Sequence, residues 1–315
     1  MGDEPSIPLL PLLKPWYRLL ETADGIVLEH GRSTVGFGGA AATQLLPALL
    51  PLLDGERTVD EIVDVLGRPV ESAVENALGL LARHALLTEG PPALPRSRVE
   101  RTAIALAQMA PLSPSRIAGR LAETRVLVEG DAGLASATAR LLRRSGVTVL
   151  RSGDEAATFV ATAGRAGEPQ LDLRNELALE HGTTWLPFGC FDGAAATIGP
   201  LVVPGETACY RCLVLRRDAS SGCTSELVSL RAVPVRAPLA PTLVTLIASV
   251  ATERILRWIG FGDPTIPGTV ATLTTVPRLG LTDDVLLRAP RCPACSGIAA
   301  SGLPVPWHEA RWAQA

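Results

Sequence analysis

The chain has almost no lysine. Lys14 is the only one among 315 residues, and every other basic side chain is an arginine. This absence excludes any chemistry after residue 14 that depends on a lysine ammonium group. Acidic and basic residues nearly balance, with a net charge of −3, so the basic excess typical of nucleic-acid-binding proteins is missing. We therefore expect no nucleic-acid partner.

Long apolar runs are missing as well. The segment from residue 6 to 13 is interrupted by Pro8 and Pro11, a pattern that does not fit a signal peptide. The longest apolar run, residues 237–251, is too short to cross a bilayer and is soon followed by Glu253 and Arg254. Together with the cysteine pairs described next, these patterns predict a cytoplasmic protein without a membrane-spanning segment.

Two cysteine pairs share one short spacing. Cys209 and Cys212 are separated by two residues, and so are Cys292 and Cys295. Each C-x-x-C turn places two thiolates on one side of a tight loop, and two such turns complete a zinc site with no open position for substrate. We predict a structural zinc site. The alternative, two redox dithiols, is disfavoured because neither pair is expected to open a helix in a thioredoxin-like βαβ unit.

The first 90 residues predict a winged-helix-like α+β module. Three strands are expected at residues 17–22, 26–30 and 33–37, joined by short turns containing Gly25 and Gly31. Helical patterns follow at residues 40–53 (broken by prolines), 58–67 (opened by a capping box) and 69–85. DNA binding is disfavoured because Glu71 and Glu75 begin the third helix, where a recognition helix approaches phosphates. Residues 91–97 predict a linker.

The remainder predicts an α/β unit over residues 98–300, followed by a tail at 301–315. A helical stretch at 99–122 precedes a strand at 125–129, a glycine turn, a helix ending near residue 144 and a strand at 147–150. This order is the opening βαβ of a Rossmann-like sheet. Later strands are expected at residues 158–161, 184–188, 196–203 and 269–275, and a long buried helix at 241–259.

Several stretches of this unit carry a family pattern. They are residues 126–135, Phe188-Gly189-x-x-Asp192-Gly193, residues 204–212, Leu239-Ala240-Pro241 and the final Cys-Pro-Ala-Cys. In order and spacing, the unit resembles the ThiF/MoeB-like family, relatives of the ubiquitin-activating enzymes. The resemblance implies that the four cysteines hold a structural zinc. It also implies that an active member would bind ATP and adenylate a C-terminal carboxylate.

The residues of the expected nucleotide loop depart from that family. Its G-x-G-G-x-G pattern reads Gly130-Asp131-Ala132-Gly133-Leu134-Ala135 here, so two glycines have become alanine. Asp131 also places a negative charge where a phosphate would approach a helix N-terminus.

Three further departures point the same way. Arg151 and Ser152 follow the second strand instead of a ribose-binding acid, with Asp154 further on, and Ala163 replaces the family's Mg²⁺-binding aspartate. The family's phosphate-binding lysine has no counterpart after Lys14. We predict a pseudoenzyme that does not bind ATP.

The N-terminal module resembles the PqqD-like precursor-peptide recognition element, on the Leu13-Lys14-Pro15-Trp16 lead-in and the three-stranded meander. Together the two units resemble the leader-binding partner proteins of azole-forming clusters, the ocin-ThiF-like proteins of thiopeptide or bacteriocin biosynthesis. Such partners work with a separate YcaO-type cyclodehydratase, which converts Cys, Ser and Thr of a precursor peptide into azolines. The resemblance implies a non-catalytic adaptor that binds the leader and docks this enzyme, with a homodimer left open.

We expect the leader to add as a strand beside residues 33–37, with its apolar side chains entering a cleft against helix 70–85. The candidate groove residues are Thr34, Val35, Gly36, Phe37, Val74, Leu78 and Leu81. For the three helix residues a place in the core is an equal alternative. Arg32, Arg83 and Lys14 could meet acidic leader side chains.

Two other functions remain open from the sequence. One is an ATP-dependent adenylating enzyme acting on a peptide C-terminus, and the other is a winged-helix regulator fused to a zinc-stapled sensor.

Cys223 could carry a thioester or persulfide in an active relative, but an incidental loop thiol is favoured because nothing near it in sequence would lower its pKa. Cys190 is interpreted as a small buried residue.

Overall fold

The computed structural model describes residues 7–90, 97–110, 112–150, 157–165, 168–189, 191–221 and 239–297. Contacts divide the chain into two compact units, Met1–Arg96 with Ala103–Ile117, and Ser97–Thr102 with Ala118–Ala315. Several expectations lie outside the described residues. They concern most of the linker, the tail, Arg151, Ser152, Asp154, Cys190 and Cys223.

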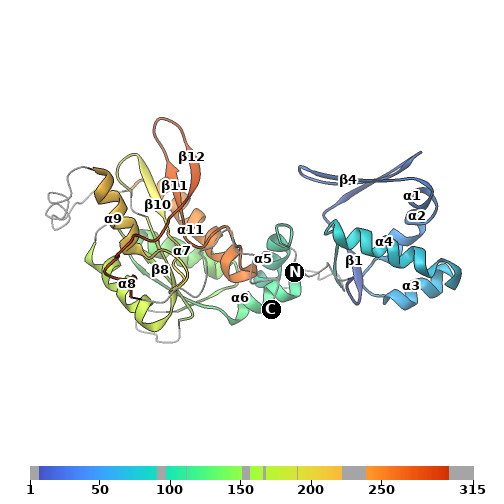
Figure 1. The fold of residues 1–315 in the computed structure, drawn as a ribbon, viewed down its shortest axis with the longest axis horizontal. Coiled ribbons are helices and arrows are strands. Elements are labelled where there is room, and N and C mark those ends of the chain that lie inside the picture. The colour runs from blue at the N-terminus through green and yellow to red at the C-terminus, as the bar shows by residue number, and fades with distance from the viewer. Residues whose placement is uncertain are drawn as a thin grey trace. The chain divides into compact units, whose positions relative to one another are not determined.

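The first unit contains an antiparallel three-stranded sheet. Its strands are β2 (Arg18–Thr22), β3 (Gly25–His30) and β4 (Ser33–Gly38), in the order β2-β3-β4. The three predicted strands are therefore present (Figure 1). Gly31, with a φ of 61°, begins the two-residue turn between His30 and Ser33, a conformation that glycine adopts without strain. A second pairing joins β1 (Pro11–Leu13), in the predicted N-terminal arm, to β5 (Leu87–Glu89).

Short helices cover one face of this sheet. They are α1 (Ala40–Gln44), α2 (Leu46–Leu49), the 3-10 turns Leu50–Leu52 and Arg68–Val70, α3 (Val59–Leu66) and α4 (Glu71–Arg83). The predicted capping box is present, because Thr58 and Glu61 exchange side-chain and backbone hydrogen bonds at the start of α3. Ile26 and Leu28 of β3 belong to the same buried core as Leu78 of α4.

The second unit is built on a seven-stranded sheet in the order β12-β11-β10-β9-β8-β6-β7. The strands are β6 (Arg125–Gly130), β7 (Thr148–Leu150), β8 (Phe159–Ala163), β9 (Thr184–Phe188), β10 (Ala195–Ile198), β11 (Thr269–Thr274) and β12 (Gly280–Val285). Strands β7, β6, β8 and β9 are mutually parallel, and β10, β11 and β12 extend the sheet in antiparallel fashion. The parallel half is the predicted Rossmann-like βαβ arrangement.

Helices lie on both faces of this sheet. They are α7 (Ala132–Arg144), α8 (Pro169–His181), α9 (Tyr210–Ser221) and α11 (Pro241–Phe261). Helix α11 packs on α7, whereas α8 packs on α9, so the sheet separates two helical layers (Figure 1). Although α11 has 21 residues, neither it nor any other helix among the described residues is long and apolar enough to cross a membrane.

The structure differs from the sequence expectations at several places. The strand predicted at 196–203 is the shorter β10, which ends at Ile198. The single predicted helix at 99–122 is two helices, α5 (Arg98–Ala107) and α6 (Pro114–Glu123), because a proline favours the first turn of a new helix. Strand β12 was not predicted, since its acidic residues have low strand propensity. The first C-x-x-C does open a helix, α9, but β10 and β11, which precede and follow α9 in sequence, pair antiparallel. The helix therefore does not belong to a thioredoxin-like βαβ unit, which the argument against a dithiol required.

Candidate functional site

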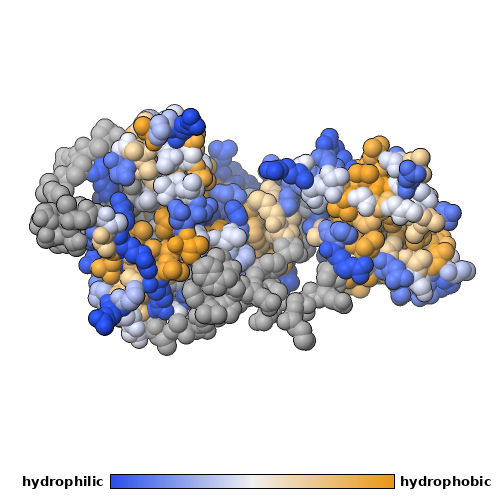
Figure 2. Space-filling model, turned by 45° about the horizontal axis from the view of Figure 1, so that its top comes forward, coloured by the Kyte–Doolittle hydropathy of each residue, from blue (hydrophilic) through white to orange (hydrophobic). Residues whose placement is uncertain are grey.

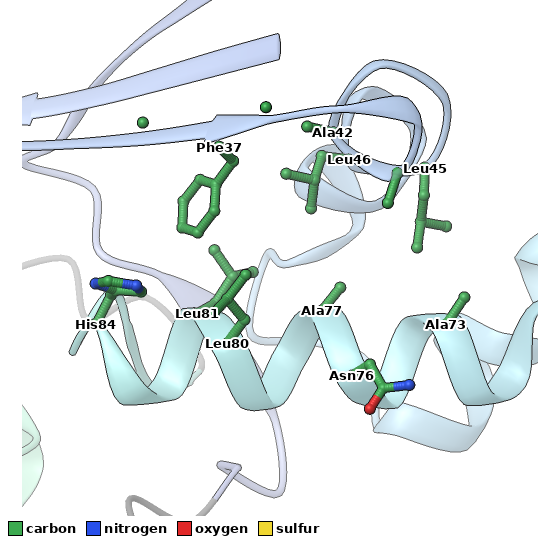
Figure 3. A pocket seen from close by; sticks show the side chains of 13 residues that line it. Phe37, Ala42, Leu45, Leu46, Ala73, Asn76, Ala77, Leu80, Leu81 and His84 are labelled. Carbon is green, nitrogen blue, oxygen red and sulfur yellow. The ribbon is translucent and has the colours of Figure 1, made fainter.

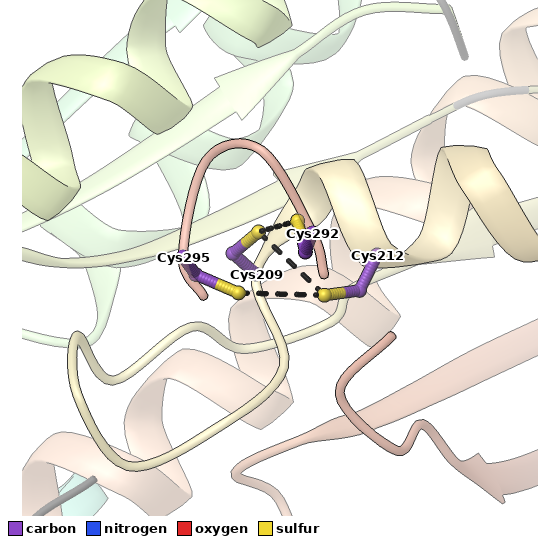
Figure 4. A group of neighbouring side chains, drawn as sticks. All are labelled: Cys209, Cys212, Cys292 and Cys295. Atoms are coloured by element: carbon purple, nitrogen blue, oxygen red, sulfur yellow. Dashed lines mark hydrogen bonds between the residues drawn. The ribbon is translucent and has the colours of Figure 1, made fainter. Parts of the chain in front are cut away.

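The four predicted cysteines meet in one buried cluster. Cys209 and Cys212 come from the start of α9, and Cys292 and Cys295 come from the loop that follows β12 (Figure 4). All four sulfur atoms lie within 4.8 Å of one another. The sequence reasoning found this cluster because the spacing of the two pairs is itself the signal.

The sulfur separations fit a metal better than a disulfide. Sγ of Cys209 lies 3.8 Å from that of Cys212 and 3.7 Å from that of Cys292, and Cys212 lies 3.5 Å from Cys295. Zinc–sulfur bonds of about 2.3 Å in a tetrahedron give sulfur–sulfur edges of about 3.8 Å. A disulfide would need about 2.05 Å. Four buried sulfur donors at these distances can hold a metal ion.

Neighbouring groups favour the thiolate form of Cys212. The hydrogen bond from Cys209 holds the pKa of the Cys212 thiol well below its usual range, and the Ala289 N–H, 3.3 Å from the sulfur, acts in the same direction. That same hydrogen bond and burial raise the pKa of Cys209. The supporting loop is fixed by Arg288, which donates to the Cys295 carbonyl at 2.6 Å.

A second site is an apolar groove in the first unit, between β4 and α4. It encloses about 570 Å³. Its lining residues are Gly36, Phe37, Gly38, Ala41, Ala42, Leu45, Leu46, Ala73, Asn76, Ala77, Leu80, Leu81 and His84. Phe37 and Leu46 point into the groove from one side, and Ala73 and Ala77 from the other (Figure 3). Apolar residues also reach the surface over much of the face of this unit that Figure 2 presents.

Some of the residues predicted from the sequence to form the groove line it, and others do not. Gly36, Phe37 and Leu81 line it. Val74 and Leu78 are fully buried in the core, as the alternative allowed. Val35 packs partly buried against the same core, and Thr34 is exposed. The sequence reasoning missed the small residues of α4 and α1, because alanines give no amphipathic signal.

The free edge of β4 adjoins the groove. Because a two-residue turn makes His30 and Ser33 a hydrogen-bonded pair, alternation along the ladder directs the N–H and C=O groups of Thr34, Gly36 and Gly38 away from β3. The hydrogen bond from Gly39 N–H to the Asp24 carbonyl fits this register. Among the described residues β4 is the last strand in its sheet, so these groups can pair with an added strand.

A third place of interest is the crevice where β6 and β8 end, the position at which Rossmann-like sheets bind nucleotides. Gly130 has a φ of 97°, and a Cβ there would lie 1.9 Å from the Ala163 carbonyl oxygen, so only glycine fits. Asp131 caps α7, and its carboxylate accepts the Leu134 N–H at 3.0 Å. Ala132 and Gly133 form the first turn of the helix. The Asp131 carboxylate thus occupies the helix N-terminus that would otherwise attract a phosphate.

An ion pair also lies beside this crevice. Glu129 of β6 accepts two hydrogen bonds from Arg174 of α8, at 2.7 and 2.9 Å, and one from the Thr162 hydroxyl at 3.2 Å. The arrangement uses both carboxylate oxygens and the guanidinium fork. Sequence reasoning missed it, although a glutamate ending an otherwise apolar strand was a usable signal.

Comparison with known proteins shows the fold. The chain matches no protein-family model and no curated protein. Among solved structures it is similar to the heterocyclase TruD, with a TM-score of 0.72 and 25% identity, over 91% of this chain and 43% of TruD. The chain therefore spans less than half of TruD's length. It is also similar to the microcin C7 biosynthetic enzyme MccB in complex with N-formylated MccA, with a TM-score of 0.66 and 14% identity, over 91% of this chain and 99% of MccB. The similarity to Escherichia coli MccB with ATP has a TM-score of 0.65 and 14% identity, over the same 91% of this chain and 99% of MccB. The chain thus shares its fold with the matching part of TruD and with MccB.

Proposed function

We propose that this protein binds the leader of a ribosomally made precursor peptide in the groove between β4 and α4, and presents it to a separate YcaO-type cyclodehydratase that forms azolines. One observation carries the proposal. An apolar groove of about 570 Å³ runs beside a strand edge whose N–H and C=O groups are free to pair. Strand addition takes affinity from main-chain hydrogen bonds and specificity from the pockets that receive alternate side chains.

The comparisons support this assignment. TruD is a heterocyclase, and MccB was solved together with MccA. The first unit would then be a PqqD-like recognition element over residues 1–90, and the second a ThiF-like docking scaffold for the cyclodehydratase, with a homodimer as a further expectation. The groove residues would be those that line it, with Gly36 and Gly38 supplying backbone groups.

The test is fluorescence polarisation with a labelled leader peptide from the precursor encoded beside a YcaO gene in the same genome. Gly36→Pro removes one outward N–H without removing a bond to β3, and should weaken binding about tenfold, the equivalent of one to two hydrogen bonds. The matched control is Glu21→Pro, which removes an outward N–H at the opposite edge, in β2. Equal affinity of the two variants for the leader would contradict the groove assignment.

We propose that the four cysteines hold one structural zinc ion and that the site takes no part in catalysis. The sulfur separations of 3.5–3.8 Å and the complete burial of the donors support this. A closed four-thiolate site has no position for a substrate or water. Four reduced thiols also suit the cytoplasm, where we place the protein.

We further propose that the crevice does not bind ATP. The carboxylate of Asp131 at the helix N-terminus, Ala163 at the end of β8 and the commitment of Arg174 to Glu129 all support this, because each removes a partner of phosphate or Mg²⁺. The alternative is an adenylating enzyme acting on a peptide C-terminus, and it is favoured by the similarity to MccB solved with ATP. ATP-dependent pyrophosphate exchange with the precursor decides between them, since only the adenylating enzyme would catalyse it.

A further inference from the structure

The only lysine of the chain is nine-tenths buried. Lys14 is 8% exposed, and its backbone is fixed on both sides: its N–H donates to the Leu86 carbonyl at 2.9 Å, and its carbonyl accepts the Tyr17 N–H at 3.2 Å. Within the described part of the chain, no acceptor forms a hydrogen bond or ion pair with its amine. The amine lies over the ring of Trp16, whose centroid is 5.8 Å from Nζ.

A lysine side chain that is mostly buried and has no counter-ion among the described residues is an unfavourable arrangement. Burial lowers the pKa of Lys14, which means that folding disfavours the charged form. Two carboxylates of the same unit are already engaged, since Glu29 pairs with Arg18 and Glu89 accepts the N–H groups of Leu9 and Leu10. A cation–π contact offsets only part of the desolvation. An anionic partner that arrives from outside would offset this cost.

Contacts connect Lys14 to both elements that form the groove. Leu86, its backbone partner, lies two residues beyond His84, which lines the groove at the end of α4. Trp16, beneath its amine, contacts His30 with ring centroids 6.5 Å apart, and His30 faces Ser33 at the start of β4. Ser33 lies three residues before Gly36, or about 10 Å along a strand. Lys14 does not itself line the groove, but these contacts connect it to the end of β4 at which Ser33 lies.

We propose that Lys14 receives a carboxylate side chain of the bound peptide, so that the ligand combines an apolar segment for the groove with one aspartate or glutamate at a fixed distance from it. The inference rests on the proposed function and adds the chemical class of the peptide. A flexible four-carbon stem carrying a compact charge suits this task, because it can turn toward an incoming carboxylate. Loss of this charge-assisted pair should weaken an acidic peptide about 10- to 100-fold.

The test uses the full-length protein and a phage-displayed library of random 12-residue peptides. We expect the wild-type protein to select apolar residues together with an acidic residue at one position. Lys14→Met should select the same apolar pattern without the acidic residue, and Lys14→Arg should retain it. Arg68→Met, which removes an exposed positive charge of the same unit, is the control for general electrostatics and should select as the wild type does.

A second readout follows the amine itself. Reductive ¹³C-methylation gives a single lysine signal, separate from that of the N-terminal amine, and binding of a selected acidic peptide should raise its pKa, whereas the peptide with Gln or Asn at that position should not. Selected peptides without an acidic preference, or an unmoved lysine signal, would overturn the inference and leave the groove assignment standing. If no peptide is selected by any variant, the groove assignment fails and the Lys14 inference fails with it.

Discussion

A large side chain placed in the groove should weaken peptide binding while changing the stability of the fold only a little. Ala77 projects from α4 into the cavity toward Leu46, and Ala77→Trp would place an indole there (Figure 3). A new buried apolar area of about 100 Å² is worth about 2.5 kcal/mol. Overpacking costs about 1–3 kcal/mol, so the free energy of unfolding should change by no more than about 1–2 kcal/mol.

The same substitution should have a large effect on the ligand. The indole takes the place of one apolar side chain of the peptide, whose burial is worth about 1.5–3 kcal/mol. Leader affinity should therefore fall about 10- to 150-fold, measured by fluorescence polarisation beside a thermal melt. Ser72→Trp is the matched control, because Ser72 is exposed on the same helix and does not line the groove. An Ala77→Trp protein that melts normally and binds the leader as tightly as Ser72→Trp would refute the groove as the binding site.

Three further results are expected. Mass spectrometry of metals should find one zinc per chain, and Cys212→Ser should lose it and lower the melting temperature, since metal binding in such sites is worth about 10–16 kcal/mol. Acidification should release the zinc because protons compete for the thiolates, and a metal content that is unchanged in mild acid would count against a four-thiolate site. Lys14→Met should stabilise the protein by about 1–2 kcal/mol at pH 7, since a buried ammonium is removed. Because the folded-state pKa is lowered, that advantage is full below this pKa and should shrink in denaturation experiments as the pH rises toward 10.5; a constant difference would argue against burial as the cause.

The sequence revealed those features whose chemistry is local. The C-x-x-C pairs predicted a cluster because a fixed spacing constrains geometry within each turn, and only the meeting of the two turns needed the fold. The strands of the first unit were also predictable, since turn residues separate them. The first turn is Ala23-Asp24, one residue before the predicted Asp24-Gly25, because Gly25 already pairs with Thr22 as the first residue of β3. The capping box was likewise predictable, because its two members, Thr58 and Glu61, are only three residues apart in sequence.

Features that depend on the packing of distant segments could not be predicted from the sequence. Hydrophobic periodicity identified the buried face of α4, Val74 and Leu78, but the face that lines the groove carries Ala73 and Ala77, whose small side chains give no signal. The pairing of Glu129 with Arg174 joins residues 45 positions apart and depends on the crossing of β6 and α8. The burial of Lys14 could not be predicted either. It depends on how the whole first unit packs around this side chain, and not on the residues next to it in sequence.

The position of the cysteine cluster along the chain sets an order of events during synthesis. Strand β5, the last of the first unit, ends at Glu89, whereas the fourth sulfur donor is residue 295. At about 5–20 residues per second, roughly 10–40 seconds separate the two on the ribosome. The groove and its lysine are therefore translated well before the metal can close its loop. If the groove binds a leader peptide as proposed, a nascent chain would be able to bind it before the second unit receives its zinc. Zinc starvation would then accumulate a species that binds the peptide but lacks the completed second unit.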